Sequence, residues 1–344
     1  MKVLFYCFKE YISIMRFVRI ILSLIIAFCL LFTTFYGASV IAKENQALTT
    51  TQYKGIITVW QIDGFEGGTG SRKQFLLSVA RSFEKQFDGV LVMVVNQTKT
   101  SAEENIIKGV YPDLISYSQG VEISGCFEIQ TKKSVNGGKV GEKVFATPWC
   151  RGGYVLIRNA NLTTEFNKNI ENLLVSQSEY TQPLTAFMMS GYTAKNIEVL
   201  KPVDAYVKFV SGKQPYFLGT QRDVVRLTNR GFDFDVIALT EYNDLFQYFS
   251  LMSTDNLKRD YAKQFIDYVL TNEVQQKLVE ISMFSAFIDI SSNEKLYTEL
   301  QKNKNGTTVS VFTPSLKLKE MQELSFKAVL GDENSKNKIK NILI

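Results

Sequence analysis

Residues 60 to 72, with the sequence WQIDGFEGGTGSR, bring together four glycines, two carboxylates and an arginine between two apolar runs. A glycine-rich turn of this kind first suggests a phosphate-binding loop. A P-loop would need a Lys-Ser or Lys-Thr pair at a fixed distance after its glycines, and the dinucleotide fingerprint would need a third glycine where Lys73 stands. Neither requirement is met, so the segment is not predicted to bind a nucleotide.

Asp63 and Glu66 are the two acids of this segment. A glycosidase needs two carboxyls roughly 5–10 Å apart on either side of the bond that it cleaves. Alternatively, a carboxylate here could accept hydrogen bonds from the hydroxyls of a bound sugar, or the acids could simply flank a turn, where such residues are common. Binding is the expected role, and hydrolysis is kept as the alternative.

The same segment is expected to start a helix at Ser71, whose free backbone N–H groups and positive dipole end favour anions and hydroxyls. A second strand–turn–helix pattern occurs at residues 219–223, GTQRD. Arg72 and Arg222 would then stand at two helix starts that face each other and could clamp an anion. The alternative is that both arginines are structural and are tied to Glu66 and Asp223 or to a neighbouring carbonyl.

Aromatic side chains at expected strand ends could stack on a sugar ring. Trp60, Phe65, Trp149 and Tyr154 are the candidates, and the alternative for each is a place in the core. No catalytic residue, metal ligand or cofactor is predicted. The predicted ligand-binding set is Trp60, Asp63, Glu66, Gly68, Thr69, Gly70, Ser71, Arg72, Trp149, Arg151, Thr220, Arg222 and Asp223.

The composition narrows the possible functions. The chain of 344 residues contains no histidine, which removes Ser-His-Asp and Cys-His nucleophile pairs and HExxH zinc sites. Its net charge is +5, from 39 basic and 34 acidic residues, and no basic block is interleaved with aromatics. Nucleic-acid binding is therefore not expected. Carboxylate chemistry, lysine chemistry and pure binding remain.

The N-terminal residues resemble an export signal. The apolar run IILSLIIAFCLLF, residues 20–32, follows Arg16 and Arg19, and residues 40–42, VIA, offer a cut after Ala42. The alternative is an uncleaved membrane anchor, since the run is long. Translation could start at Met1 or at Met15. In either case the bulk of the chain is expected outside the cytoplasmic membrane, at its extracellular face or secreted.

Two of the four cysteines, Cys7 and Cys29, lie in this leader. Phe28 precedes Cys29 where a lipoprotein signal needs a small residue, so lipid attachment is not expected. In an exported chain Cys126 and Cys150 could form one disulfide, and two free buried thiols are the alternative.

The first half of the chain alternates between strand and helix patterns. Residues 55–62, 90–95 and 113–117 are continuous apolar runs that predict strands, and residues 71–87 carry an apolar face with helical spacing. A short helix is expected at residues 101–108. Continuous apolar strands separated by helices are typical of a parallel sheet covered on both faces. The fold class is therefore α/β.

The second half is less regular. A long extended segment is expected at residues 144–158, broken by Pro148 and by Gly152 and Gly153. The expected tail, residues 335–344, is basic and frayed, and residues 303–306 predict a turn. Strands are expected at residues 214–218 and 234–240, and helices at residues 179–190, 203–210, 242–252, 258–270 and 273–283.

Several short sequences resemble those of extracellular solute-binding proteins of ABC importers. They are ITVW at residues 57–60, FLLSVARSFEK at residues 75–85, PDLI at residues 112–115, and the helix pair formed by residues 262–270 and 275–281. The resemblance covers most of residues 55–285, and no single motif in it is diagnostic.

This resemblance implies a type 2 periplasmic-binding fold, with two α/β lobes joined by a hinge and a ligand held between them. Lobe one would comprise residues 54–145 and a return segment, 234–290, while lobe two would comprise residues 146–233. Residues 291–344 are not assigned to either lobe. A monomer would pass a carbohydrate, or an anionic sugar derivative, to a membrane permease. The alternatives are a hydrolase using Asp63 and Glu66, and a sensor or adhesion module on the same fold.

Overall fold

The computed structural model describes residues 19–36, 53–290, 295–301 and 306–343. Residues Arg19–Tyr36 form a helix long and apolar enough to cross a membrane, a test that signal sequences also pass. This helix fits the expected signal peptide or anchor. The expected cut after Ala42 and the two alternative start residues lie outside the described residues. The chain from Tyr53 to Ile344 forms a separate compact unit.

The first of two five-stranded sheets in this unit has the order β2-β1-β3-β12-β6. Its strands are β1 (Gly55–Ile62), β2 (Val90–Gln97), β3 (Leu114–Tyr117), β6 (Thr147–Arg151) and β12 (Phe246–Leu251). Strand β1 runs parallel to β2 and β3, and β12 runs antiparallel to β3 and β6. Strands β3, β6 and β12 are buried on both faces, as the apolar run at residues 113–117 predicted for β3, but β2 is not, because Leu91 and Met93 are exposed.

Helices cover both faces of this sheet. On one face α2 (Arg72–Glu84) packs against α7 (Asn256–Val269), where Phe83 and Phe265 meet edge to face with ring centroids 5.3 Å apart. On the other face α3 (Lys99–Ile107) contributes Ala102 and Ile106 to a second apolar cluster. Helix α2 starts where it was expected, because the Ser71 hydroxyl caps it by accepting a hydrogen bond from the backbone N–H of Gln74.

The second sheet has the order β11-β7-β10-β8-β9. Its strands are β7 (Tyr154–Asn159), β8 (Asn169–Ser176), β9 (Thr193–Leu200), β10 (Tyr216–Thr220) and β11 (Phe234–Ala238). Strand β8 runs parallel to β9 and β10, and β7 is antiparallel to its neighbours. The accompanying helices are α4 (Pro183–Met189), α5 (Pro202–Val210), α6 (Gln221–Arg230), α10 (Ser315–Val329) and α11 (Glu333–Leu343).

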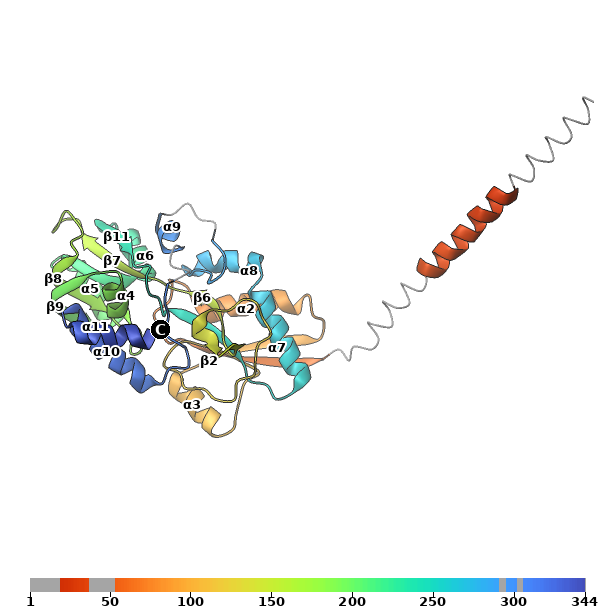
Figure 1. Ribbon diagram of the computed structural model, residues 1–344, viewed down its shortest axis with the longest axis horizontal. Coiled ribbons are helices and arrows are strands. Elements are labelled where there is room, and N and C mark those ends of the chain that lie inside the picture. The colour runs from red at the N-terminus through yellow and green to blue at the C-terminus, as the bar shows by residue number, and fades with distance from the viewer. Residues whose placement is uncertain (1–18, 37–52, 291–294, 302–305, 344) are drawn as a thin grey trace, which may run out of the picture. The chain divides into compact units, whose positions relative to one another are not determined.

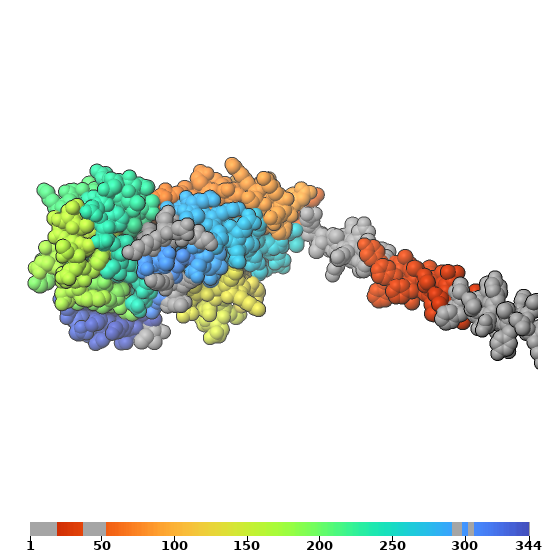
Figure 2. All heavy atoms as spheres, turned by 90° about the horizontal axis from the view of Figure 1, so that it is seen from above, coloured from red at the N-terminus to blue at the C-terminus, as the bar shows by residue number. Residues whose placement is uncertain are grey.

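Small elements complete the unit. They are η1 (Asn136–Gly138), β4 (Lys139–Val140), β5 (Lys143–Val144), α8 (Asn272–Gln276), η2 (Lys277–Ile281) and α9 (Lys295–Gln301). Figure 1 shows β2, α2, α3 and α7 on one side of the unit and β7, β8, β9 and α4 to α6 on the other. In Figure 2 the residues of α8 and α9 lie between these two groups on the face in view.

Two of the places where the chain crosses between the two sheets are neighbours. The first crossing follows β6 at Gly152 and Gly153, and the second joins β11 to β12. The two crossings are bonded to each other: the Gly152 N–H donates to the Leu245 carbonyl at 2.7 Å, and the Asn243 side chain donates to the Gly152 carbonyl at 3.0 Å. Adjacent crossings of this kind form a hinge region.

Two expectations for the second half were wrong. Residues 242–252 were expected to be helical, but residues 246–251 form β12, which lies between β3 and β6 and is buried along its whole length. A strand buried on both faces has no alternation of polar and apolar residues, so its pattern is ambiguous. The expected frayed tail is helix α11, whose Ser335 and Ile339 are buried against the rest of the unit.

The strand pairing shows that the chain passes from one sheet to the other at residues that differ from the expected lobe boundaries. Strand β6 lies beyond residue 146 but belongs to the first sheet, and β11 lies beyond residue 233 but belongs to the second. Most of the expected turn at residues 303–306 lies outside the described residues.

Cys126 and Cys150 are free thiols, so the first of the two alternatives, a disulfide between them, is wrong. The Sγ atom of Cys126 lies 3.6 Å from Sδ of Met252, and Cys150 is fully buried in the first-sheet core. Burial raises the pKa of the Cys126 thiol to about 11 and raises that of Cys150 further, so both are unreactive.

A buried acid stands in the hinge region. Oδ1 of Asp244 accepts a hydrogen bond from the Tyr154 hydroxyl at 2.6 Å, and Oδ2 accepts one from the Gln182 backbone N–H at 3.1 Å. Burial raises the pKa of Asp244 to about 7, although these hydrogen bonds act to lower it. The folded state therefore holds this proton more tightly than the unfolded state does.

A pH-dependent stability follows from this shift. For a carboxyl with a raised folded pKa, the free energy of unfolding falls as the pH rises from about 4 towards about 7. Asn cannot ionise, so we expect Asp244→Asn to reduce the fall in melting temperature between pH 5 and pH 8. The exposed Asp204→Asn is the control, and it should keep the wild-type pH profile. Parallel profiles for wild type and Asp244→Asn would contradict this assignment.

Candidate functional site

A cavity of about 610 Å³ lies between the two sheets. Its first wall is the loop that joins β1 to α2, residues 63–72. Its second wall is formed by Ser178 after β8, Pro202 at the start of α5, and Arg222 in the first turn of α6. These segments follow the carboxyl ends of parallel strands in both sheets, where open α/β sheets bind their ligands.

The glycines of the loop make room for the protein's own chain. The Gly68 N–H donates to Sδ of Met283 at 2.9 Å, and a Cβ on Gly68 would stand 1.6 Å from the Ile281 carbonyl oxygen. A Cβ on Gly70 would stand 2.6 Å from Cγ2 of the same isoleucine. Thr69 shares a hydrogen bond of 2.8 Å with Ser282. The loop is thus fixed on the segment that follows η2.

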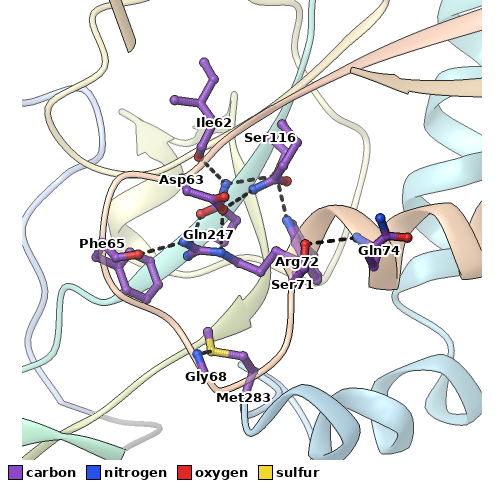
Figure 3. Close-up of polar contacts among 12 residues, drawn as sticks. Ile62, Asp63, Phe65, Gly68, Ser71, Arg72, Gln74, Ser116, Gln247 and Met283 are labelled. Carbon is purple, nitrogen blue, oxygen red and sulfur yellow. Dashed lines mark hydrogen bonds and ion pairs between the residues drawn. The ribbon is translucent and has the colours of Figure 1, made fainter. Parts of the chain in front are cut away.

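Arg72 is held by three first-sheet residues (Figure 3). Its Nε lies 2.7 Å from Oδ1 of Asp63, and its two terminal nitrogens donate to the Phe65 carbonyl at 2.7 Å and to Oε1 of Gln247 at 3.1 Å. The guanidinium also lies 4.4 Å from the centre of the Phe65 ring. With 5% of its surface exposed and its charge paired, Arg72 shapes the β1–α2 loop.

The support for Arg72 extends into the sheet. The side-chain amide of Gln247 donates to the Ile62 carbonyl at 2.9 Å and to the Ser116 hydroxyl at 3.0 Å. Ser116 also accepts a hydrogen bond of 2.9 Å from the Trp149 indole. Strands β1, β3, β6 and β12 therefore contribute to one buried polar network that ends at the cavity wall.

Three residues of the predicted set belong to the core. Trp149 is fully buried between Phe75 and Phe249, so it cannot stack on a ligand in this structure. Trp60 is also buried, in the cluster beneath α3. The guanidinium of Arg151 is fully buried and donates to the carbonyls of Ser285 and Leu300, both at 3.0 Å, so it ties the crossing to the C-terminal part of the chain.

Arg222 behaves differently from Arg72. It forms an ion pair with Glu66, which joins α6 on the second-sheet side to the β1–α2 loop on the first-sheet side. Both side chains keep about a third or less of their surface exposed, at 27% and 30%. This pair spans the cavity directly, and it matches the structural alternative that the sequence left open.

Thr220 and Asp223 fix the start of α6 rather than line the cavity. Oδ2 of Asp223 accepts a hydrogen bond from the Thr220 backbone N–H at 2.9 Å, as in a capping box. Burial raises the pKa of Asp223 to about 6, and the hydrogen bond from Thr220 and the charge of Arg226 act in the opposite direction. Thr220 and Asp223 therefore contribute to the site by positioning Arg222.

Sequence reasoning missed several polar groups beside the cavity. Ser178 lines it. Oε1 of Gln61, Oγ of Ser118 and Nε2 of Gln119 are buried and have no hydrogen-bond partner within the described part of the chain. Gln61 and Ser118 adjoin the lining residues, since Gln61 donates to Asp63 and a Cβ on Gly64 would stand 1.8 Å from Oγ of Ser118, and Gln119 is the next residue in the chain. The signal that could have identified them is their position, near the carboxyl end of β1 and directly after β3.

Comparisons with known proteins support the fold. No protein-family model and no curated protein match the sequence. The galacto-N-biose-/lacto-N-biose I-binding protein of an ABC transporter from Bifidobacterium longum matches with a TM-score of 0.57 and 13% identity, over 84% of this chain and 95% of that one.

Two other solved structures match similarly. A cyclo/maltodextrin-binding protein complexed with maltotetraose has a TM-score of 0.54 and 12% identity, over 86% of this chain and 98% of that one. A two-component system protein that mediates signal transduction has a TM-score of 0.54 and 14% identity, over 78% and 100%. The chain therefore has the two-lobed α/β fold of periplasmic binding proteins, as expected from the sequence.

The two arginines should respond differently to truncation. Arg72→Ala leaves Asp63 and Gln247 without their partner, and we expect a loss of about 2–3 kcal/mol in the free energy of unfolding. Arg222→Ala removes a partly exposed pair and should cost about 1 kcal/mol or less. Urea unfolding of both variants measures this, and equal losses would contradict the distinction.

The glycine contact gives a second stability test. Gly68→Ala forces a methyl group against the Ile281 carbonyl, so we expect a loss of about 3 kcal/mol from strain. Thr69→Ala, in the same loop, removes only the hydrogen bond to Ser282 and should cost about 1 kcal/mol. If Gly68→Ala were as stable as Thr69→Ala, the loop would not be fixed on residues 281–283.

Proposed function

We propose that this chain is an extracytoplasmic solute receptor that captures a carbohydrate between its two lobes and delivers it to an ABC permease. The observation that carries the proposal is the cavity of about 610 Å³ between the carboxyl ends of strands from both sheets. A ligand held there contacts both lobes at once. Binding energy can then favour the closed arrangement over an open one, as in other hinged receptors.

The Glu66–Arg222 pair supports this closure. It joins the β1–α2 loop to α6 across the cavity, so the pair must separate when the lobes move apart. The crossings after β6 and β11 supply the axis for such a movement. A partly exposed ion pair contributes little to the stability of the closed form. Ligand binding can therefore decide whether the open or the closed form is more populated.

The charges of the cavity favour a neutral ligand. Its charged lining residues are two acids, Asp63 and Glu66, and two arginines, and each arginine is paired with one of the acids. The other polar side chains of the lining are the hydroxyls of Thr69, Ser71 and Ser178, and the unpartnered Ser118 hydroxyl adjoins the lining at Gly64. Hydroxyls of a sugar pair well with such groups, while an anion would have to compete with the existing ion pairs. An anionic sugar is therefore the less favoured ligand.

The similar structures agree with this proposal. Two of them are named for sugars that they bind, and one belongs to an ABC transporter. The N-terminal helix, Arg19–Tyr36, would direct the chain across the membrane as a signal peptide or hold it there as an anchor. In both cases the two-lobed unit would act outside the cytoplasmic membrane, and we expect it to act as a monomer.

The hydrolase alternative lacks support from the site. Asp63 and Glu66 are each engaged by an arginine, which leaves neither free to act on a glycosidic bond. A sensor remains the second candidate, because a two-component system protein shares the fold. Transport of the ligand in cells that carry the permease, and its loss on deletion of this chain, would separate a transport receptor from a sensor.

A ligand screen tests the proposal. We expect neutral sugars to raise the melting temperature, because a ligand that binds only the folded state stabilises it. Lacto-N-biose, maltose and xylobiose are the first probes, and glucose 6-phosphate and galacturonate are the charged counterparts. Stabilisation by the charged sugars alone would contradict the proposal that the ligand is neutral. No stabilisation by any sugar would contradict the carbohydrate proposal.

The unpartnered amide provides a residue-level test. Gln119→Ala should weaken the binding of a neutral sugar by about tenfold, since a hydrogen bond from a buried amide contributes about 1–1.5 kcal/mol. Gln86→Ala, an exposed glutamine on the same lobe, is the matched control and should leave the affinity unchanged. Titration calorimetry measures both. Equal affinities of the two variants for the sugar would show that Gln119 does not contact the ligand.

A further inference from the structure

Two further cavities adjoin the candidate site on the second-sheet side. The nearer one, of about 530 Å³, shares Ser178 and Pro202 with the candidate site. The farther one, of about 600 Å³, shares Gln177, Glu179 and Val199 with the nearer one. The three cavities therefore adjoin one another in a row from the site, past the ends of β8 and β9, to helix α10, and we call the two cavities beyond the site the groove.

The far end of the groove has a mixed lining. Leu184 of α4, Val199 of β9 and Phe326 of α10 provide its apolar surface. Charged and amide side chains surround them, among them Glu179 and Lys319, which form an ion pair of 3.5 Å. An apolar and aromatic floor with polar edges matches a sugar ring, which has apolar C–H faces and hydroxyls around its rim.

The wall of the groove is fixed in place. The side-chain amide of Gln322 donates to the carbonyls of Glu179 at 3.0 Å and Thr181 at 2.9 Å, which ties α10 to the loop after β8. Helix α10 is further joined to α4 by a hydrogen bond of 2.6 Å between Ser325 and Thr185. In Figure 1 α10 lies beside α4 and β9. A groove with such fixed walls is a preformed surface.

We propose that this groove binds the further units of an oligosaccharide whose first unit occupies the candidate site. The inference rests on the proposed function, and it specifies the ligand as a chain of sugars rather than a single sugar or a compact disaccharide. Because the groove lies on the second-sheet side, the added units contact one lobe only. They would therefore strengthen binding without changing the contact that closes the lobes.

The test compares ligands of increasing length. Titration calorimetry with maltose to maltohexaose and with xylobiose to xylohexaose should show an affinity that rises at least about tenfold from the shortest to the longest ligand in one series. Phe326→Ala should abolish most of that rise and leave the affinity for the shortest ligand unchanged. Val199→Lys, which places a charge in the groove from an exposed edge-strand position, should do the same.

Val203→Lys is the matched control, because Val203 is exposed on α5 and does not line the groove. It should retain the full dependence on ligand length. If short sugars bind and length adds nothing, or if the groove variants weaken short and long ligands equally, the groove inference is wrong and the proposed function stands. If no sugar of any length binds, the proposed function is wrong, and the groove inference, which depends on it, is wrong as well.

Discussion

The buried guanidinium of Arg72 is the interaction on which the cavity depends. A charge with 5% exposure is tolerable only if its donors are satisfied, and here Asp63, Phe65 and Gln247 satisfy them. The loop after β1 must therefore curl back over the start of α2. Gln247 in turn brings β12 and β3 into the same network. The shape of the first wall thus follows from the requirement to pair one charge.

A second constraint acts at the crossings between the sheets. Gly152 bonds to Asn243 and Leu245, so the crossings after β6 and β11 are tied to each other. The buried Asp244 stands beside them with a raised pKa. The Glu66–Arg222 pair, by contrast, is partly exposed and spans the cavity. Buried contacts thus lie at the crossings, and a partly exposed ion pair lies across the cavity.

The paired arginines also change the expected chemistry of the site. Taken from the sequence alone, Arg72 and Arg222 suggested an anion clamp. In the structure each is neutralised by an acid of the same loop, and the unpartnered polar atoms that adjoin the lining, Oε1 of Gln61 and Oγ of Ser118, belong to neutral side chains. Net charge alone could not reveal this, because pairing is a property of geometry. The lining is therefore better suited to hydroxyls than to phosphate.

The sequence by itself determined the α/β class, strand β1, helix α2 with its Ser71 cap, and the location of the β1–α2 loop at the carboxyl end of a strand. These features depend on neighbours in the chain, so local patterns reveal them. The tertiary structure decided that residues 246–251 form a central strand, that Trp149 is core, and that Arg222 reaches Glu66. Those outcomes depend on partners that lie far away in the sequence. A local periodicity does not show which distant side chain will pack against a residue or satisfy a buried polar group.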